Sequence, residues 1–320
     1  MSRTYDLVHR TRYSYDEPVT GSYGRAVLVP RDQPGQERHS VDVHVDPEPA
    51  DLAEHVDYFG NTSTYFAVTT PHSELVVTAR SRLTVDREQS AVASLPRATW
   101  GDVDRAVRPG GLLELNGPVH YDGSAAPDET DGIGLVALRE ALLPSRHVAF
   151  SDEVRAWSEP SFEVGRPLAE VLADLAHRIR TELTYRSGST TVHTTQIELL
   201  TQQMGVCQDF AHLMIAALRM HGVPARYVSG YIETVPAPGK EKLRGADASH
   251  AWVSAWLPGA GWVEIDPTND AFVDERYVVL GWGRDYSDVP PLRGVIFTEG
   301  SGSRLSVSVD LVPAGAEPFA

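Results

Sequence analysis

The chain has 320 residues, a length that suggests about two domains, and 42% of them are hydrophobic, enough for a sizeable core in each. Its 28 basic and 44 acidic residues give a formal net charge of −16, which opposes binding to nucleic-acid phosphates or to an anionic membrane surface. No segment reaches the ~18 apolar residues of a membrane span, and the N-terminus lacks the apolar core of an export signal. Together with the single cysteine, these features predict a cytoplasmic protein that binds neither nucleic acid nor membrane.

The first part of the chain has the pattern of short β-strands. Apolar and polar residues alternate in runs such as YDLVHRTRYSY, ERHSVDVHV and STYFAVTT, and PRDQPG and FGN mark turns between them. We therefore predict an antiparallel, sandwich-like β-domain over residues 1–87. Residues 88–165 are rich in Pro and Gly and show little periodicity, which predicts an irregular connection with short helices.

Three helices are predicted after this connection. The first begins near Pro167. The second follows Thr195, which forms a capping-box pattern with Glu198. The third runs over about 207–221, because Gly222 and the proline after it end the apolar periodicity. The first helix carries an apolar stripe made of Leu168, Val171, Leu172, Leu175, Ile179 and Leu183.

Cys207, the only cysteine, lies in the first turn of the third helix. A lone thiol cannot form an internal disulfide or a thiolate metal cage. The free N–H groups and the positive dipole end of a helix favour the thiolate, as a catalytic nucleophile requires. Free cysteines are also common as small buried residues, and from this segment alone both interpretations stand.

The stretch 248–270 alternates on both sides of a PGAG turn and predicts a β-hairpin. His250 and Asp266 are equidistant from position 258, so a symmetric hairpin places their side chains opposite each other, with Cβ atoms about 4.5–5.5 Å apart. The carboxylate then orients the imidazole, although a slip of one residue would put the two on opposite faces. Helices followed by an antiparallel sheet indicate an α+β core over residues 166–320.

These residues resemble a known family. GVCQDFAHLMIAALR, SHAWVSAWLPGAGWVEIDPTN and GRDYSDVPP, in this order, are similar to the bacterial transglutaminase-like family of the papain-like cysteine enzymes. HRTRYSYDEPV and LVPRDQ resemble the β-domain that precedes the core in that family. The resemblance implies that Cys207 is the nucleophile, His250 the general base and Asp266 the residue that orients it.

The residues and the resemblance together predict a cysteine acyl-transfer enzyme that acts on peptide or protein amides through a thioester. Water as the second substrate would make it a protease or amidase, and a primary amine would make it an acyltransferase; the sequence does not choose. The alternative is a non-catalytic peptide- or protein-binding module that retains the fold. A redox-sensing thiol lacks a resolving cysteine.

The remaining site predictions concern the oxyanion donor and metals. The backbone N–H of Cys207 is the first oxyanion candidate. Tyr185, which the resemblance places near the site, is a side-chain candidate, with a packed aromatic as the alternative. Gln202 and Gln203 are weaker candidates. No metal or cofactor is predicted, because no HExxH or EF-hand pattern occurs and His212 and His221 should lie on opposite helix faces. Three tryptophans of the hairpin are predicted to lie in the core or in the wall of a cleft: Trp252, Trp256 and Trp262. An internal ion pair is favoured for Arg284 and Asp285, which follow the hairpin.

Overall fold

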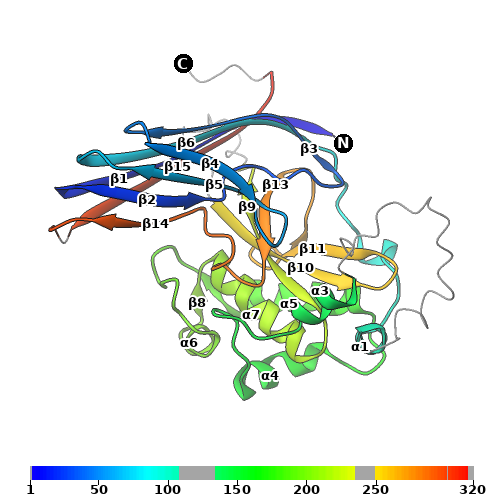
Figure 1. Ribbon diagram of the computed structural model, residues 1–320. Coiled ribbons are helices and arrows are strands. Elements are labelled where there is room, and N and C mark those ends of the chain that lie inside the picture. Colours follow the sequence, from blue (N-terminus) through cyan, green and yellow to red (C-terminus); the bar gives the residue numbers. More distant parts are fainter. Residues whose placement is uncertain (1, 108–133, 235–248, 301, 316–320) are drawn as a thin grey trace, which may run out of the picture.

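The computed structural model describes residues 2–107, 134–234, 249–300 and 302–315. The predicted α+β class is confirmed, with a β-sandwich at one side and a core of helices packed on an antiparallel sheet at the other (Figure 1). All three sheets with four or more strands are built from antiparallel pairs of the described strands.

The sandwich consists of two four-stranded sheets with the orders β15-β1-β6-β3 and β14-β2-β5-β4. Alternating side chains from both sheets meet in a shared apolar layer that includes Tyr15, Leu28, Phe66 and Leu75. Burial on one face only explains the period-two pattern of the sequence. The strands are β1 (Arg3–Val19), β2 (Gly21–Ala26), β3 (Gln36–Asp46), β4 (Asp51–Val56), β5 (Thr62–Val68), β6 (His72–Val85), β14 (Leu292–Phe297) and β15 (Ser303–Pro313).

The last two strands correct the prediction that everything after residue 166 belongs to the core. β14 pairs with β2, and β15 pairs with β1 in a continuous register from Tyr5↔Pro313 to Tyr15↔Ser303. Both strands therefore complete the sheets of the N-terminal sandwich. An alternating pattern shows which face of a strand is buried but carries no information about its partner, and for this reason the sequence did not reveal the return of the chain.

The described part of the connection contains short helices, as predicted. They are η1 (Val92–Ser94), α1 (Trp100–Val107), α3 (Leu135–Glu140), α4 (Asp152–Ser158) and η2 (Glu159–Ser161). Residues 108–133, which include most of the Pro- and Gly-rich segment, lie outside the described residues.

The core sheet has the order β12-β11-β10-β9-β13, and helices α5, α6 and α7 lie below it in Figure 1. α7 packs against β9 and β10, and the predicted apolar stripe of α5 is buried in the layer between helices and sheet. The hairpin and the three predicted helices are confirmed. Their bounds and those of the other core elements are α5 (Leu168–Glu182), β7 (Thr184–Tyr185), α6 (Gln196–Gln202), β8 (Met204–Gly205), α7 (Cys207–Met220), β9 (Ala225–Ile232), β10 (Ser249–Leu257), β11 (Gly261–Asp266), β12 (Ala271–Phe272) and β13 (Tyr277–Gly283).

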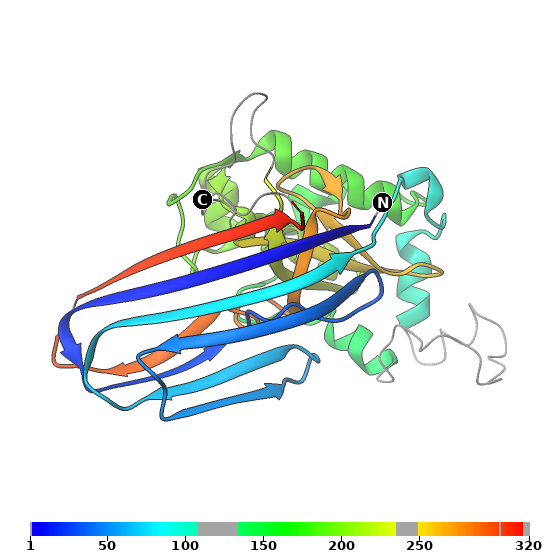
Figure 2. The same cartoon turned by 90° about the horizontal axis from the view of Figure 1, so that it is seen from above.

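Two buried amides fix the sandwich to the core sheet. Gln36 bonds the backbone N–H and the C=O of Val279, each at 2.8 Å. Asn61 does the same for Trp282, at 3.0 Å to its N–H and 2.9 Å to its C=O. The long strands β15, β1 and β6 run side by side over the core in the view from above (Figure 2), and side chains such as Tyr5 pack on β9 and β13. The two parts of the chain thus form one continuous structure.

Candidate active site

The start of α7 is held by a buried acid. The Asp209 carboxylate accepts the N–H of Val206 at 2.8 Å and the hydroxyl of Thr190 at 2.6 Å, so it caps the first turn. A Cβ on Gly205 would lie 2.6 Å from a methyl group of Leu199, which explains why the approach to the helix needs glycine. Burial outweighs the two hydrogen bonds and raises the pKa of Asp209. Cys207 follows this junction and is partly buried.

The hairpin register differs from the symmetric arrangement that we predicted. Pairing from Leu257↔Gly261 to Val253↔Ile265 centres the turn on residue 259, not 258. Continued by one pair, this register puts Asp266 opposite Trp252, so Asp266 and His250 are diagonal neighbours rather than a facing pair. The residue opposite Asp266 is thus two positions from His250, and residues two apart on a strand point to the same face. The side chains of His250 and Asp266 therefore remain on one face of the sheet. His250 Nε2 lies 2.7 Å from an Asp266 carboxylate oxygen.

Asp266 is buried and surrounded by donors. Besides His250, its carboxylate accepts the Asn269 side-chain amide at 2.6 Å, the Tyr277 hydroxyl at 2.8 Å and the N–H of Thr268 at 2.8 Å. Burial raises the pKa of Asp266, but His250 and these donors outweigh it and hold the pKa below its ordinary value. The carboxylate is therefore ionised and fixed. Sequence analysis missed Asn269 and Tyr277, although the DPTN segment carries the signal of an Asx-turn.

The charge state of His250 is set by its two neighbours. Burial lowers its pKa, but the Asp266 carboxylate and a hydrogen bond and charge interaction with Cys207 outweigh burial and raise the pKa to about 10. With Nε2 bonded to Asp266, Nδ1 is the ring nitrogen left for the thiol. The structure thus brings together Cys207, His250 and Asp266, and the buried carboxylate keeps the imidazole protonated beside the sulfur.

Tyr185 is placed near the thiol by a small sheet. β7 and β8 pair in parallel, with Tyr185 beside Gly205, two residues before Cys207. Partial burial and the charge of Cys207 raise the pKa of Tyr185, so its hydroxyl is protonated at neutral pH and can donate. The side chain is 52% exposed, which fits a cleft residue better than a packed aromatic. Gln202 and Gln203 are exposed at the end of α6 and beyond it.

A second set of residues missed by sequence analysis borders the thiol on the sheet side. Tyr227 is buried, and burial together with the charge of Cys207 raises its pKa. Its ring lies 5.0 Å from that of His212, which accepts the N–H of Tyr286. Burial lowers the pKa of His212 to about 3, so this imidazole is neutral. No local motif marks these contacts, because they join α7, β9 and the segment after β13.

The other residues singled out from the sequence have packing or pairing partners in the structure. His221 stacks on Phe162 at 3.8 Å, which confirms that it occupies a different face of α7 from His212. In the described part of the chain, no group of three or more His, Cys, Asp or Glu side chains is placed to hold a metal ion. Trp252 and Trp256 are buried, as predicted. Three further pairings complete the account: Trp262 stacks on Arg226, Arg284 pairs with Asp288, and Asp285 binds the N–H of His147.

Comparisons with known proteins identify the family. Residues 5–84 match the bacterial transglutaminase-like N-terminal region, and residues 137–267 match the transglutaminase-like superfamily. An uncharacterized protein of Mycobacterium tuberculosis is 45% identical over 97% of this chain and 92% of its own length. The chain belongs to the transglutaminase-like superfamily.

Two further similarities agree with this assignment. A protein from Cytophaga hutchinsonii, provisionally described as a cysteine protease, shares the fold, with a TM-score of 0.69 at 18% identity over 100% of this chain and 93% of its own. A protein-glutamine gamma-glutamyltransferase of Pseudomonas aeruginosa is 42% identical over 72 residues, which cover 22% of this chain and 11% of that protein. Among the helices of the described residues, none has the length and apolar character needed to cross a bilayer.

Proposed function

We propose that this protein is a cysteine acyl-transfer enzyme acting on peptide or protein amide bonds, with Cys207 as nucleophile, His250 as acid and base, and Asp266 as the residue that orients His250. The observation that carries the proposal is a His250 imidazole that is bonded to the buried Asp266 carboxylate and interacts with Cys207 at a helix N-terminus. Nucleophile, base and orienting group in this order are the general requirement for covalent catalysis by a thiol.

In the first half-reaction, the Cys207 thiolate attacks the amide carbonyl carbon and forms a tetrahedral intermediate. His250 enters this step protonated, since its pKa is raised to about 10. It gives its proton to the leaving nitrogen, the C–N bond breaks, and an amine or ammonia departs from the thioester. Asp266 stays ionised throughout, because its hydrogen bonds favour the carboxylate.

The tetrahedral oxyanion needs donors, each worth about 2.7–4 kcal/mol. The N–H of Cys207 belongs to the first turn of α7, where backbone donors have no partner within the helix. The Tyr185 hydroxyl is the side-chain donor that we assign to the same oxyanion. The position of Tyr185 beside Gly205 supports this role.

In the second half-reaction, His250 takes a proton from the acceptor, which attacks the thioester and regenerates the thiolate. Water as acceptor gives hydrolysis, and a primary amine gives a new amide. The segment similar to a protein-glutamine gamma-glutamyltransferase supports testing glutamine side chains as acyl donors.

The test is incubation of the full-length protein with glutamine-containing peptides, with and without a labelled primary amine, followed by mass spectrometry. Label incorporation identifies transfer, a gain of about one mass unit identifies deamidation, and cleavage with gain of water identifies proteolysis. A Cys207→Ala sample under the same conditions is the matched control. Absence of turnover and of a trapped thioester with every amide, under reducing conditions, would contradict the proposal and favour a binding module.

A further inference from the structure

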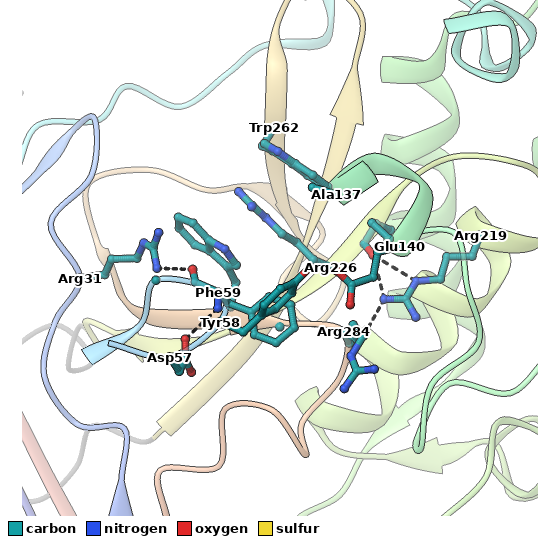
Figure 3. Close-up of a pocket in the computed structure, with 15 residues that line it drawn as sticks. Arg31, Asp57, Tyr58, Phe59, Ala137, Glu140, Arg219, Arg226, Trp262 and Arg284 are labelled. Carbon is teal, nitrogen blue, oxygen red and sulfur yellow. Dashed lines mark hydrogen bonds between the residues drawn. The ribbon is translucent and has the colours of Figure 1, made fainter. Parts of the chain in front are cut away.

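The joint between the sandwich and the core contains a hollow of about 420 Å³ near the C-terminal end of α7, the arginine-lined pocket drawn in Figure 3. The donors of these arginines are used within the fold. Arg31 donates to the backbone oxygen of Phe59 at 2.7 Å, and Arg219 donates to that of Arg284 at 2.6 Å. The Arg284 side chain is itself paired with Asp288. The pocket is therefore part of the structural joint between the sandwich and the core.

At the other end of α7, Tyr227 is a buried tyrosine whose hydroxyl has no hydrogen-bond partner in the part of the chain that the structure describes. The side chain is 3% exposed, and its hydroxyl oxygen is not among the polar atoms that are sealed from solvent without a partner. Native proteins rarely keep a buried donor that neither ligand nor water satisfies. The hydroxyl is therefore placed to meet a ligand. Three other buried tyrosines each have a partner at 2.7 or 2.8 Å: Tyr5 bonds Glu233, Tyr231 bonds His9, and Tyr277 bonds Asp266.

Tyr227 points from the core sheet toward the start of α7. It pairs with Val253 across β9 and β10, and both side chains belong to the apolar layer between sheet and helices, on which Cys207 also packs. The Tyr227 ring lies 5.0 Å from that of His212, which is five residues, or about 7.5 Å, beyond Cys207 along α7. The charge of Cys207 contributes to the raised pKa of Tyr227, in agreement with this position. The hydroxyl is therefore protonated at neutral pH and can donate.

The two tyrosines near the thiol lie on different sides of α7. Tyr185 packs on Phe210, with ring centres 6.3 Å apart, whereas Tyr227 packs on His212. Phe210 and His212 are two residues apart, and because a helix turns about 100° per residue, about 200° of rotation separates their side chains. With Tyr185 assigned to the oxyanion, the Tyr227 hydroxyl is free to bind another polar group of the substrate.

A row of rings extends from Tyr227 to the surface. The ring of Tyr286 lies 6.3 Å from that of Tyr227, and the ring of His147 lies 6.3 Å from Tyr286 and stacks on His212 at 5.6 Å. His193, which is exposed, follows at 6.2 Å from His147. Burial raises the pKa of Tyr286 and lowers the pKa of His147, so both rings are uncharged at neutral pH. Flat, uncharged rings of this kind suit packing against an aromatic group of a ligand.

We propose that Tyr227 is a substrate-binding residue. Its hydroxyl donates to a backbone carbonyl oxygen of the peptide that Cys207 attacks, and the row of rings from Tyr227 to His193 holds an aromatic side chain of that peptide. The substrate class is thus a peptide with an aromatic residue beside the reacting amide. This inference deepens the proposed function and rests on it, because it places the acyl donor at Cys207.

The test is alkylation of Cys207 in the full chain, because Cys207 is the only cysteine and its labelling needs no turnover of an amide. The reagents are iodoacetamide, iodoacetyl-alanine amide and iodoacetyl-phenylalanine amide. Mass spectrometry at increasing reagent concentration gives the limiting rate and KI, the concentration for half of that rate. We expect KI of the phenylalanine reagent to be at least about fivefold below that of the alanine reagent, because its ring leaves water.

Tyr227→Phe removes only the hydroxyl. We expect it to raise KI of both peptide reagents about three- to tenfold, the effect of one lost hydrogen bond, and to leave the rate with iodoacetamide unchanged. The free energy of unfolding should stay the same or increase, because the hydroxyl has no partner among the described residues of the folded protein. Tyr231→Phe is the matched control, since it removes a hydroxyl that bonds His9 and should lower stability without changing KI.

His193→Ala changes an exposed ring and should narrow the difference between the two peptide reagents, so the row of rings stays testable if Tyr227→Phe does not fold. Equal KI values for the two peptide reagents, no saturation with either, or an unchanged KI in Tyr227→Phe would overturn the inference. A loss of stability in Tyr227→Phe as large as in Tyr231→Phe would make the hydroxyl a structural group and overturn it as well. Labelling remains measurable if no amide is turned over, so failure of the proposed activity and failure of this inference give different results.

Discussion

The two ends of helix α7 use charge in opposite ways. At its N-terminus, the His250 imidazole lies between Cys207 and the buried carboxylate of Asp266, which holds it in the charged form. Near its C-terminus, Arg219 is satisfied by backbone carbonyls, and further arginines gather beyond it around a hollow. Both arrangements agree with the helix dipole, which favours anions at the first end and cations at the last. The first end is suited to moving protons, whereas the second fixes the helix to the backbone around it.

Replacing the proposed nucleophile should have the largest effect on activity and should affect only the N-terminal end of α7. Cys207→Ala should lower amide turnover by roughly 10⁴-fold or more, because no other group can form the thioester. Steady-state kinetics and mass spectrometry of the acyl-enzyme measure this loss. Arg284→Gln should retain both, and an equal loss in the two variants would show that the ends of α7 are not independent.

Changing the orienting acid should have the next largest effect. Asp266→Asn keeps the shape but removes the charge that raises the pKa of His250, so we expect turnover to fall roughly 10²–10⁴-fold. The rate of Cys207 alkylation by iodoacetamide at pH 6 should fall as well, since less thiolate is paired with imidazolium. Asp270→Asn is a suitable control because Asp270 is bonded to His177 at the surface. Unchanged alkylation in Asp266→Asn would contradict the ion pair.

Removing the proposed oxyanion donor should have a smaller effect, and that effect should fall on kcat rather than on KM. Tyr185→Phe should lower kcat roughly 10²-fold with little change in KM, because the hydroxyl acts on charge that develops only in the transition state. A loss confined to KM would instead make Tyr185 a substrate-binding residue. An unchanged kcat and KM would remove it from the site.

The contact between the sandwich and the core sheet should contribute to the stability of the protein. Asn61→Ala removes both bonds to the backbone of Trp282, and we expect the free energy of unfolding to fall by about 2–4 kcal/mol because two buried groups lose partners. Urea denaturation measures the change, and Gln202→Ala, an exposed amide, should stay near wild type. Alkylation of Cys207 in the folded variant should be unaffected.

A pH titration tests the charge assigned to His250. The folded-state pKa of His250, about 10, lies above its ordinary value of 6.5, so the stability it contributes is fully present below about pH 6.5 and is lost as pH rises through 10. The free energy of unfolding of wild type should therefore fall as pH rises between 7 and 10. Asp266→Asn should flatten that slope, and parallel curves for the two proteins would contradict the assigned cause.

The sequence predicted the thiol end far better than the pocket end. Cys207 sits at a helix start with clear stop signals after it, and His250 and Asp266 share one hairpin, so local periodicity placed each residue on its element. The expectation that the thiol meets the imidazole came from the family resemblance. The error of one position in the turn centre was harmless only because the resulting offset kept both side chains on one face. The pocket joins residues from both domains, such as Arg31 and Arg226, and no local pattern records that contact.

The pairing of β1 with β15 also has a consequence for how the molecule forms. Tyr5 and Pro313 are strand partners that lie far apart in the sequence, with the transglutaminase-like core between them. During synthesis, the edge of β1 that pairs with β15 stays unpaired until β15 has left the ribosome. Such non-local pairing makes slow completion of the sandwich the expected late step of folding, after the largely local helices of the core.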